Sequence, residues 1–233
     1  MVTSKDTPVI FARGITRRFG KKTVLQDLDF ELPQGCIYGI SGRNGTGKSV
    51  LLRILTGLVL PDAGEVFVFG RQVGREVEFA PSTGALIDRP GFLMNASGYR
   101  NLQLLASIRG LASAQKLVET LNFVGLDPHD RKPVATYSTG MRQRLGLAQA
   151  IMEDPDLLIL DEPTNGLDDV GQREIYGYLV ELRAQGKTIL LTSHNRDELR
   201  ILCDRVFYLQ AGSLEPVAQE DGEPLPAQTA ATR

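Results

Sequence analysis

The chain has 233 residues, with 26 lysines and arginines against 28 aspartates and glutamates, and therefore a formal net charge of −2. Hydrophobic residues make up 42% and charged residues 23%, which is typical of a globular domain. These values exclude a disordered chain, a collagen-like chain and a strongly basic nucleic-acid binder, and no apolar run approaches the roughly 18 residues of a membrane span.

The first third of the chain favours strands separated by turns. Apolar and β-branched runs predict strands at residues 9–12, 23–25, 28–32 and 36–41. A glycine-rich segment then leads into a helix predicted over 50–58, and another strand is predicted over 65–69.

The middle of the chain changes to helical spacing, and the last third alternates again. Apolar side chains recur at helical intervals from about residue 97 to 152. Continuous apolar runs predict buried parallel strands at 157–160 and 188–192, and a final strand is predicted at 205–209. An amphipathic helix that ends at Gly186 connects the two buried strands.

These elements predict one α/β domain over residues 1–233. No internal repeat divides the chain, and its N-terminal segment lacks the charged-then-apolar order of a signal peptide. We expect residues 8–87 and 155–216 to form an α/β core with a β subdomain. Residues 88–154 would form a helical insert, and residues 217–233 a flexible tail.

A phosphate-binding loop follows the strand at 36–41. The segment GRNGTGKS matches the pattern GxxxxGK[ST], between a predicted strand and a predicted helix as that pattern requires. Its glycines let backbone N–H groups face phosphate oxygens, with Lys48 placed to reach the β- and γ-phosphates and Ser49 to hold Mg²⁺. A glycine-rich turn without a ligand is the alternative. The nucleotide-binding residues expected here are Gly42, Arg43, Asn44, Gly45, Thr46, Gly47, Lys48, Ser49 and Val50.

Two carboxylates end the buried strand LLILDE. The carboxyl ends of parallel strands face the ligand edge of a sheet, so Asp161 is expected to hold Mg²⁺ and Glu162 to activate a water molecule. Two surface carboxylates at a strand end are the alternative. His194 follows the strand at 188–192 and is expected at the γ-phosphate, although a histidine in this position can also be an ordinary loop residue.

Together these residues resemble the ATP-binding subunit of an ABC transporter. The segment YSTGMRQ, from Tyr137, resembles the family signature LSGGQ and departs from it at three positions, while its serine and second glycine are kept. On its own, YSTG is also a plain helix cap. The resemblance implies that a second ATP-binding subunit is contacted through the signature and through the loop NGLD, and that Phe19 stacks on adenine; a hydrophobic strand-end residue is the alternative for Phe19. The nucleotide-binding residues implied in this way are Phe19, Ser138, Thr139, Gly140, Met141 and Asp168.

One departure from the family concerns the loop before the helical insert. The family usually carries a glutamine there, whereas this chain has Asp88, which accepts hydrogen bonds only and adds a charge near Mg²⁺. We therefore count Asp88 with Ser49 and Asp161 as an expected metal ligand. The surrounding segment GALIDRPGF is similar to the ATPases of bacitracin- and lantibiotic-resistance transporters.

The resemblance implies a fold and a function. The fold is a P-loop NTPase (RecA-like) core with an antiparallel β subdomain and an inserted α-helical subdomain. The function is MgATP hydrolysis through Glu162, His194 and Lys48, which powers export of a peptide antibiotic or amphipathic drug by a separate transmembrane permease. The permease would hold two ATP-binding subunits, identical or different, at the cytoplasmic face of the membrane. No nucleic acid is expected to bind. A soluble ATPase of translation or repair and a non-hydrolysing regulatory module are the alternatives.

Overall fold

A six-stranded sheet forms the centre of the molecule. The structure is a computed structural model that describes residues 8–88 and 90–217. The sheet has the order β10-β9-β3-β8-β7-β6, in which β10 is antiparallel to β9 and the other pairs are parallel. In chain order its strands are β3 (Ile37–Ser41), β6 (Thr83–Leu86), β7 (Leu157–Asp161), β8 (Thr188–Ser193), β9 (Arg205–Gln210) and β10 (Ser213–Val217).

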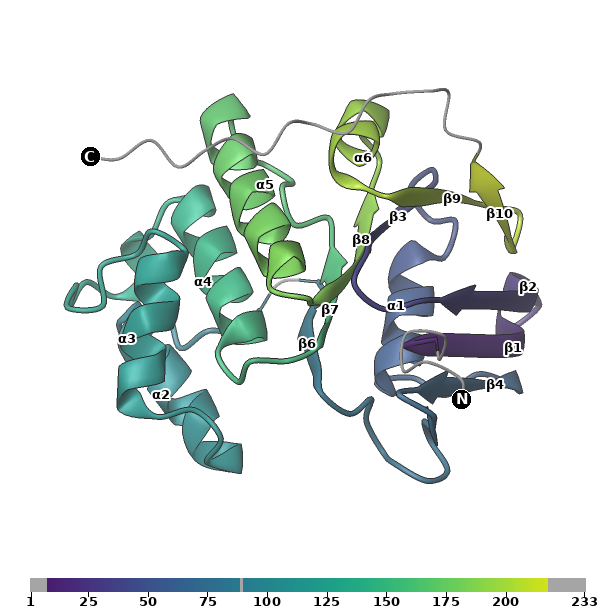
Figure 1. The fold of residues 1–233 in the computed structure, drawn as a ribbon, viewed down its shortest axis with the longest axis horizontal. Coiled ribbons are helices and arrows are strands. Elements are labelled where there is room, and N and C mark those ends of the chain that lie inside the picture. Colours follow the sequence, from purple (N-terminus) through teal and green to yellow (C-terminus); the bar gives the residue numbers. More distant parts are fainter. Residues whose placement is uncertain (1–7, 89, 218–233) are drawn as a thin grey trace.

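A second, antiparallel sheet packs on one side of the central sheet, with a helix between them (Figure 1). Its order is β2-β1-β4-β5, and the interposed helix α1 follows the phosphate loop. The elements are β1 (Ile10–Phe19), β2 (Lys22–Leu32), α1 (Lys48–Thr56), β4 (Ala63–Val68) and β5 (Arg71–Gln72).

Helices cover the other face of the central sheet (Figure 1). Helices α5 and α6 follow β7 and β8, whereas α2, α3 and α4 come from the insert between β6 and β7. Each insert helix begins at a serine whose side chain accepts a hydrogen bond from the N–H group three residues on. The helices are α2 (Gly98–Arg109), α3 (Ala114–Phe123), α4 (Thr139–Ile151), α5 (Asp169–Ala184) and α6 (Arg196–Leu202), with a short 3₁₀ turn at Val134–Thr136.

Strand β7 explains why the run LLIL is continuously apolar. Successive side chains point to opposite faces of a strand. Leu157 and Ile159 therefore belong to the core around α1, and Leu158 and Leu160 to the core beneath the other helices. Because both faces are covered, every position of this strand before Asp161 is buried and apolar.

The structure corrects several predicted bounds. The expected strands at 23–25 and 28–32 are one strand, β2, with register shifts along its pairing with β1. Helix α1 begins two residues earlier than predicted and ends at Thr56, because Gly57 takes the left-handed conformation and closes it. The elements β6, α6 and β10 were not predicted, and Val217 ends β10, so the part of the expected tail at 218–233 lies outside the described residues.

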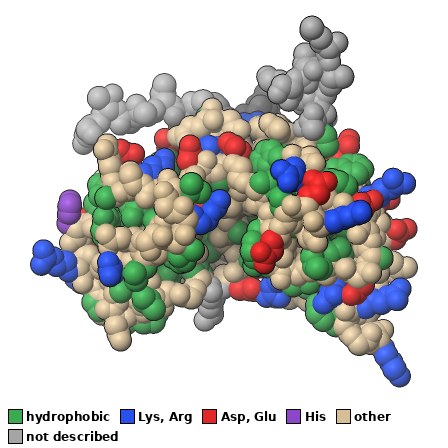
Figure 2. Space-filling model, turned by 90° about the horizontal axis from the view of Figure 1, so that it is seen from below, with side chains coloured by type: hydrophobic (Ala, Val, Ile, Leu, Met, Phe, Trp, Pro, Cys, Tyr) green, Lys and Arg blue, Asp and Glu red, His purple; other side chains and the backbone are tan. Residues whose placement is uncertain are grey.

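Two further properties concern the helices and the charges on the surface. Within the described ranges, every helix is too short or too polar to cross a membrane. On the face seen from below, positive and negative side chains are interspersed and do not gather into one basic area (Figure 2).

Candidate functional site

The carboxyl ends of three parallel strands meet at one edge of the central sheet. The register pairs Ser41 of β3 with Ser193 of β8, and Asp161 of β7 with Thr192 of β8. The loops after these strands therefore start side by side, as is usual for ligand sites in open α/β sheets. A cavity of about 1090 Å³ opens at this edge.

Gly47 places the start of α1 at the cavity. It precedes the helix with a φ of 108°, which is strained for any residue with a side chain, and a Cβ atom there would lie 2.7 Å from Val24 Cγ1. No side chain of the described residues caps this helix end. Since the first N–H groups of a helix lack intrahelical acceptors, α1 presents donors and a positive partial charge to the cavity.

Lys48 is folded over the phosphate loop. Its side chain is 6% exposed, and its ammonium group donates hydrogen bonds to the carbonyl oxygens of Gly42 at 2.8 Å and Arg43 at 3.4 Å. The same nitrogen lies 3.7 Å from Glu162 Oε1. The cation is thus held inside the loop, with a carboxylate beside it.

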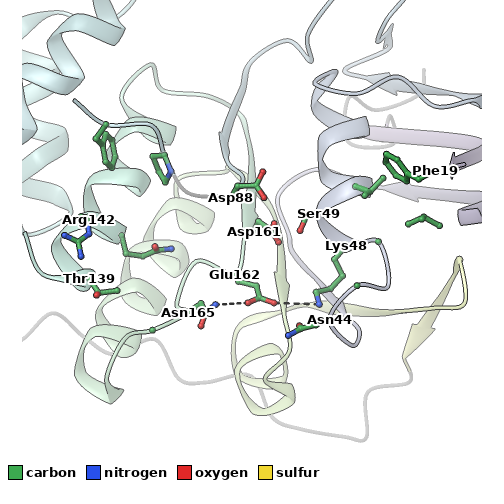
Figure 3. A pocket seen from close by; sticks show the side chains of 18 of the residues that line it. Phe19, Asn44, Lys48, Ser49, Asp88, Thr139, Arg142, Asp161, Glu162 and Asn165 are labelled. Atoms are coloured by element: carbon green, nitrogen blue, oxygen red, sulfur yellow. Dashed lines mark hydrogen bonds and ion pairs between the residues drawn. The ribbon is translucent and has the colours of Figure 1, made fainter. Parts of the chain in front are cut away.

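Glu162 is the centre of a small polar cluster (Figure 3). Besides Lys48 at Oε1, its Oε2 accepts a hydrogen bond from Asn165 Nδ2 at 3.1 Å and lies 3.4 Å from His194 Nδ1. The backbone of Glu162 has a φ of 46°, in the left-handed region that is uncommon for residues other than glycine. This turn directs the side chain toward the phosphate loop, across the cavity edge.

Thr192 connects the two acidic residues at the end of β7 through the side chain of Asp161 and the backbone of Glu162. Its side chain is fully buried, and its hydroxyl donates to Asp161 Oδ1 at 2.5 Å while accepting from the N–H group of Glu162 at 3.0 Å. One hydroxyl therefore orients both residues. Sequence reasoning missed this role, because nothing in the run TILLTS separates Thr192 from the other buried positions.

Asp88 lines the same cavity and is paired. Its Oδ2 accepts two hydrogen bonds from Arg53 of α1, at 2.5 Å from Nη2 and 3.2 Å from Nε. The charge that the sequence places in this loop is therefore compensated by a cation, and Oδ1 accepts no hydrogen bond from the described residues.

Phe19 forms the far end of the cavity. Its side chain is half exposed, and the guanidinium carbon of Arg17 lies 4.9 Å from its ring centroid. Arg17 in turn pairs with Asp62 at 2.7 Å. The ring is thus held by a cation on one side, which favours a defined orientation.

The signature segment lies on the opposite side of the cavity from Lys48 (Figure 3). Ser138 caps α4 by accepting from the N–H group of Met141 at 3.1 Å, so the plain helix cap is present. Tyr137 is buried, its hydroxyl accepts from the N–H group of Gly98 at 3.3 Å, and burial raises the pKa of that hydroxyl. The tyrosine that departs from the family pattern therefore joins the signature to α2.

The cavity brings most of the predicted residues together. The members that line it are Phe19, Asn44, Gly45, Gly47, Lys48, Ser49, Val50, Asp88, Thr139, Asp161 and Glu162. The predicted residues that do not line it are Gly42, Arg43, Thr46, Ser138, Gly140, Met141, Asp168 and His194. Of these, Asp168 accepts from the N–H group of Gly171 and caps α5.

Eight further lining residues were not predicted to bind nucleotide. Six of them belong to the segments YSTGMRQ, NGLD and GALIDRPGF, on which the resemblance rests, but Val24 and Met94 carry no local signal. The eight are Val24, Pro90, Phe92, Met94, Arg142, Gln143, Asn165 and Gly166.

The comparison with known families decides the identity of this arrangement. The family model described as ABC transporter matches residues 25–165, more than half of the chain. The chain belongs to the ABC transporter family. The predicted P-loop NTPase fold and the ATPase class of this ABC protein are confirmed with it.

Relatives and a solved structure agree with this assignment. The bacitracin transport ATP-binding protein BcrA of Enterococcus faecalis is 40% identical over 88% of this chain and 68% of its own length. The lantibiotic transport ATP-binding protein SrtF of Streptococcus pyogenes is 35% identical over 90% of both chains. A nucleotide-free ATP-binding cassette from an ABC transporter shares the fold, with a TM-score of 0.80, 22% identity and coverage of 93% of this chain and 92% of its own.

Proposed function

We propose that this ABC protein is the ATP-hydrolysing subunit of an exporter, and that it drives a separate transmembrane permease that moves a peptide antibiotic or similar amphipathic compound. The observation that supports hydrolysis most directly is the convergence of Lys48, Asp161 and Glu162 on one cavity. The substrate class is supported by the similarity to proteins named for bacitracin and lantibiotic transport.

ATP would lie along the cavity from Phe19 to the phosphate loop. The adenine stacks on the exposed face of the Phe19 ring, and the phosphates accept hydrogen bonds from the loop and from the start of α1. Lys48 exchanges its carbonyl contacts for phosphate oxygens. This exchange is favourable because a carbonyl carries only a partial charge, whereas the phosphates are anionic.

The residues at the cavity fit a magnesium ion. Ser49 and Asp161 both line it and supply hard oxygen donors, with Asp88 Oδ1 as a third. Among the described residues no group of three or more His, Cys, Asp or Glu is arranged to hold a metal, which agrees with a site completed by phosphate oxygens and water. The bound ion would neutralise charge on the phosphates.

Glu162 accepts a proton from the attacking water. Its carboxylate already accepts a hydrogen bond from Asn165 and lies beside His194, so little reorientation is needed before the water is bound. Lys48 stabilises the negative charge that develops on the γ-phosphate, and His194 holds the far side of the carboxylate. The three predicted catalytic residues thus have separate tasks.

A second ATP-binding subunit, identical or different, would complete the site. Ser138, Gly140 and Met141 lie at the start of α4, and a helix start offers N–H groups and a positive partial charge to the phosphates of a nucleotide held by the partner. Asp168, which caps the start of α5, is the other residue that would face the partner. The permease would contact the loop that precedes α2, where Leu93 and Met94 are 57% and 45% exposed, and would hold the subunit at the cytoplasmic face of the membrane.

The test compares Glu162→Gln with the wild-type chain. Glutamine keeps the size and the contact with Asn165 but removes the base, so hydrolysis should fall by about 10²- to 10⁴-fold while ATP binding is retained. ATP binding is measured with a fluorescent analogue and turnover by phosphate release. A Glu162→Gln chain that hydrolyses ATP at the wild-type rate refutes the base assignment.

Two further measurements separate the alternatives. A Gly140→Asp chain should bind ATP alone but fail to form the ATP-dependent pair, because a carboxylate would face the phosphates of the partner site. Co-purification of a permease, with ATP turnover stimulated by peptide antibiotics, would support the exporter. A wild-type chain that binds MgATP but does not hydrolyse it with its permease would favour the regulatory module.

A further inference from the structure

Glu198 is a buried carboxylate that the proposed mechanism does not use. It lies on α6, is 4% exposed, and both of its oxygens are engaged. Oε1 accepts a hydrogen bond from Thr164 Oγ1 at 2.6 Å, and Oε2 accepts one from Ser193 Oγ at 2.5 Å. A carboxylate withdrawn from water is costly unless such donors surround it, so the contacts hold it firmly.

The two hydroxyls belong to the two segments that carry the hydrolytic residues. Thr164 comes two residues after Glu162 and directly before Asn165, whose amide holds the Glu162 carboxylate. Ser193 ends β8 and directly precedes His194. Glu198 therefore connects the loop after β7 to the loop after β8 through these two hydroxyl groups.

The Ser193 side of this connection is itself fixed. The Ser193 hydroxyl accepts from the N–H group of Asn195 at 3.0 Å while it donates to Glu198. Asn195 Oδ1 in turn accepts from the N–H groups of Asp197 and Glu198 at the start of α6. The loop, the hydroxyl and the helix start form one hydrogen-bonded unit, so a shift of Glu198 would move the residue that carries the imidazole.

We infer that Glu198 is a positioning residue for ATP hydrolysis. It sets the distance between the segments that carry Glu162 and His194, whose side chains approach to 3.4 Å. The inference rests on the proposed function, since it concerns the same hydrolytic site. Glu198 touches neither the cavity nor Glu162 in the described structure, so its effect passes through Thr164 and Ser193.

Replacing Glu198 tests the connection. Glu198→Ala should lower kcat by about 10- to 100-fold, because small displacements of reacting groups are costly, while KM for ATP changes by less than about threefold. Glu198→Gln keeps one acceptor oxygen and offers an amide donor to the second hydroxyl, so it should recover part of kcat. A merely structural role would lower the melting temperature without this division between kcat and KM.

A second pair of variants avoids the risk that Glu198→Ala does not fold. Thr164→Val keeps the shape but loses the hydroxyl, whereas Thr164→Ser keeps the hydroxyl and loses a methyl group. The serine variant should recover most of the kcat that the valine variant loses. As a control for general destabilisation, Leu121→Ala removes a buried side chain of α3 in the insert, and kcat measured well below its melting temperature should stay at the wild-type value.

The outcomes separate this inference from the proposed function. A wild-type chain that neither binds nor hydrolyses MgATP overturns the proposed function and this inference together. A wild-type chain that hydrolyses ATP, with Glu198→Ala at the same kcat or with the two Thr164 variants alike, overturns the positioning role alone. A loss of kcat in Leu121→Ala as large as in Glu198→Ala also overturns it, because destabilisation alone would then explain the effect.

Discussion

Replacing Thr192 by valine should weaken both the fold and hydrolysis. Valine has nearly the same shape, so the substitution removes the hydroxyl without opening a large cavity. Asp161 then loses a donor at 2.5 Å, and the N–H group of Glu162 loses its acceptor at 3.0 Å. The Asp161 carboxylate and the Glu162 backbone each lose a contact that orients them.

The size of the effect follows from the two bonds. A hydrogen bond to a charged group contributes about 1.5–3 kcal/mol, and an unsatisfied buried N–H group costs about 1–3 kcal/mol. Asp161 is partly exposed, so water replaces part of the first contribution. We expect the free energy of unfolding to fall by about 2–4 kcal/mol, and kcat to fall about tenfold if some 1.4 kcal/mol of this is lost in the transition state.

Thr188→Val is the matched control. Thr188 is buried at the other end of the same strand, and its hydroxyl accepts from the N–H group of Gly35 at 2.9 Å, far along the strand from Asp161. Urea unfolding and phosphate release are measured for both variants, at several Mg²⁺ concentrations. Both should unfold more easily, but only Thr192→Val should lose kcat and need more Mg²⁺. Equal kcat in the two variants would show that the Thr192 hydroxyl does not orient Asp161 and Glu162 for hydrolysis.

Three further predictions concern the scaffold and the cavity. Gly84→Ala should lower the free energy of unfolding in urea by about 3 kcal/mol, because the new Cβ atom would lie 1.9 Å from a carbonyl oxygen of α4. Gly177→Ala is the control: its Cβ atom would lie in open space on α5, and it should raise the free energy of unfolding by up to about 1 kcal/mol. Phe19→Ala should raise the Kd for ATP about tenfold and leave kcat at saturation unchanged; an unchanged Kd would show that adenine stacks elsewhere. Burial raises the pKa of the Cys203 thiol, so its reactive thiolate is scarce at pH 8. Iodoacetamide should therefore label the half-buried Cys36 before Cys203, and the two cysteines should be labelled at similar rates once urea has unfolded the protein.

Local patterns in the sequence predicted where the candidate site would lie. A strand, a glycine-rich loop and a helix in that order predict a phosphate site because the geometry is contained within a dozen residues. The continuously apolar run LLIL predicts a strand buried on both faces, and the acidic residues after it predict that the strand ends at the edge of the sheet. Sequence reasoning therefore anticipated the position of Lys48, Asp161 and Glu162 at one sheet edge.

Tertiary structure decided the features that depend on residues far apart in the chain. Strand β6 has only four residues, and its pairing with β7 and its contact with α4 stabilise it. The hydrophobic pattern of such a short segment therefore does not predict a strand. The partner of Asp88 lies 35 residues away on α1, and the acceptor for Thr164 lies 34 residues away on α6. Such links arise only when parallel strands bring their ends together, because a hydroxyl or carboxylate has no preferred partner in sequence until the fold supplies one within hydrogen-bonding distance.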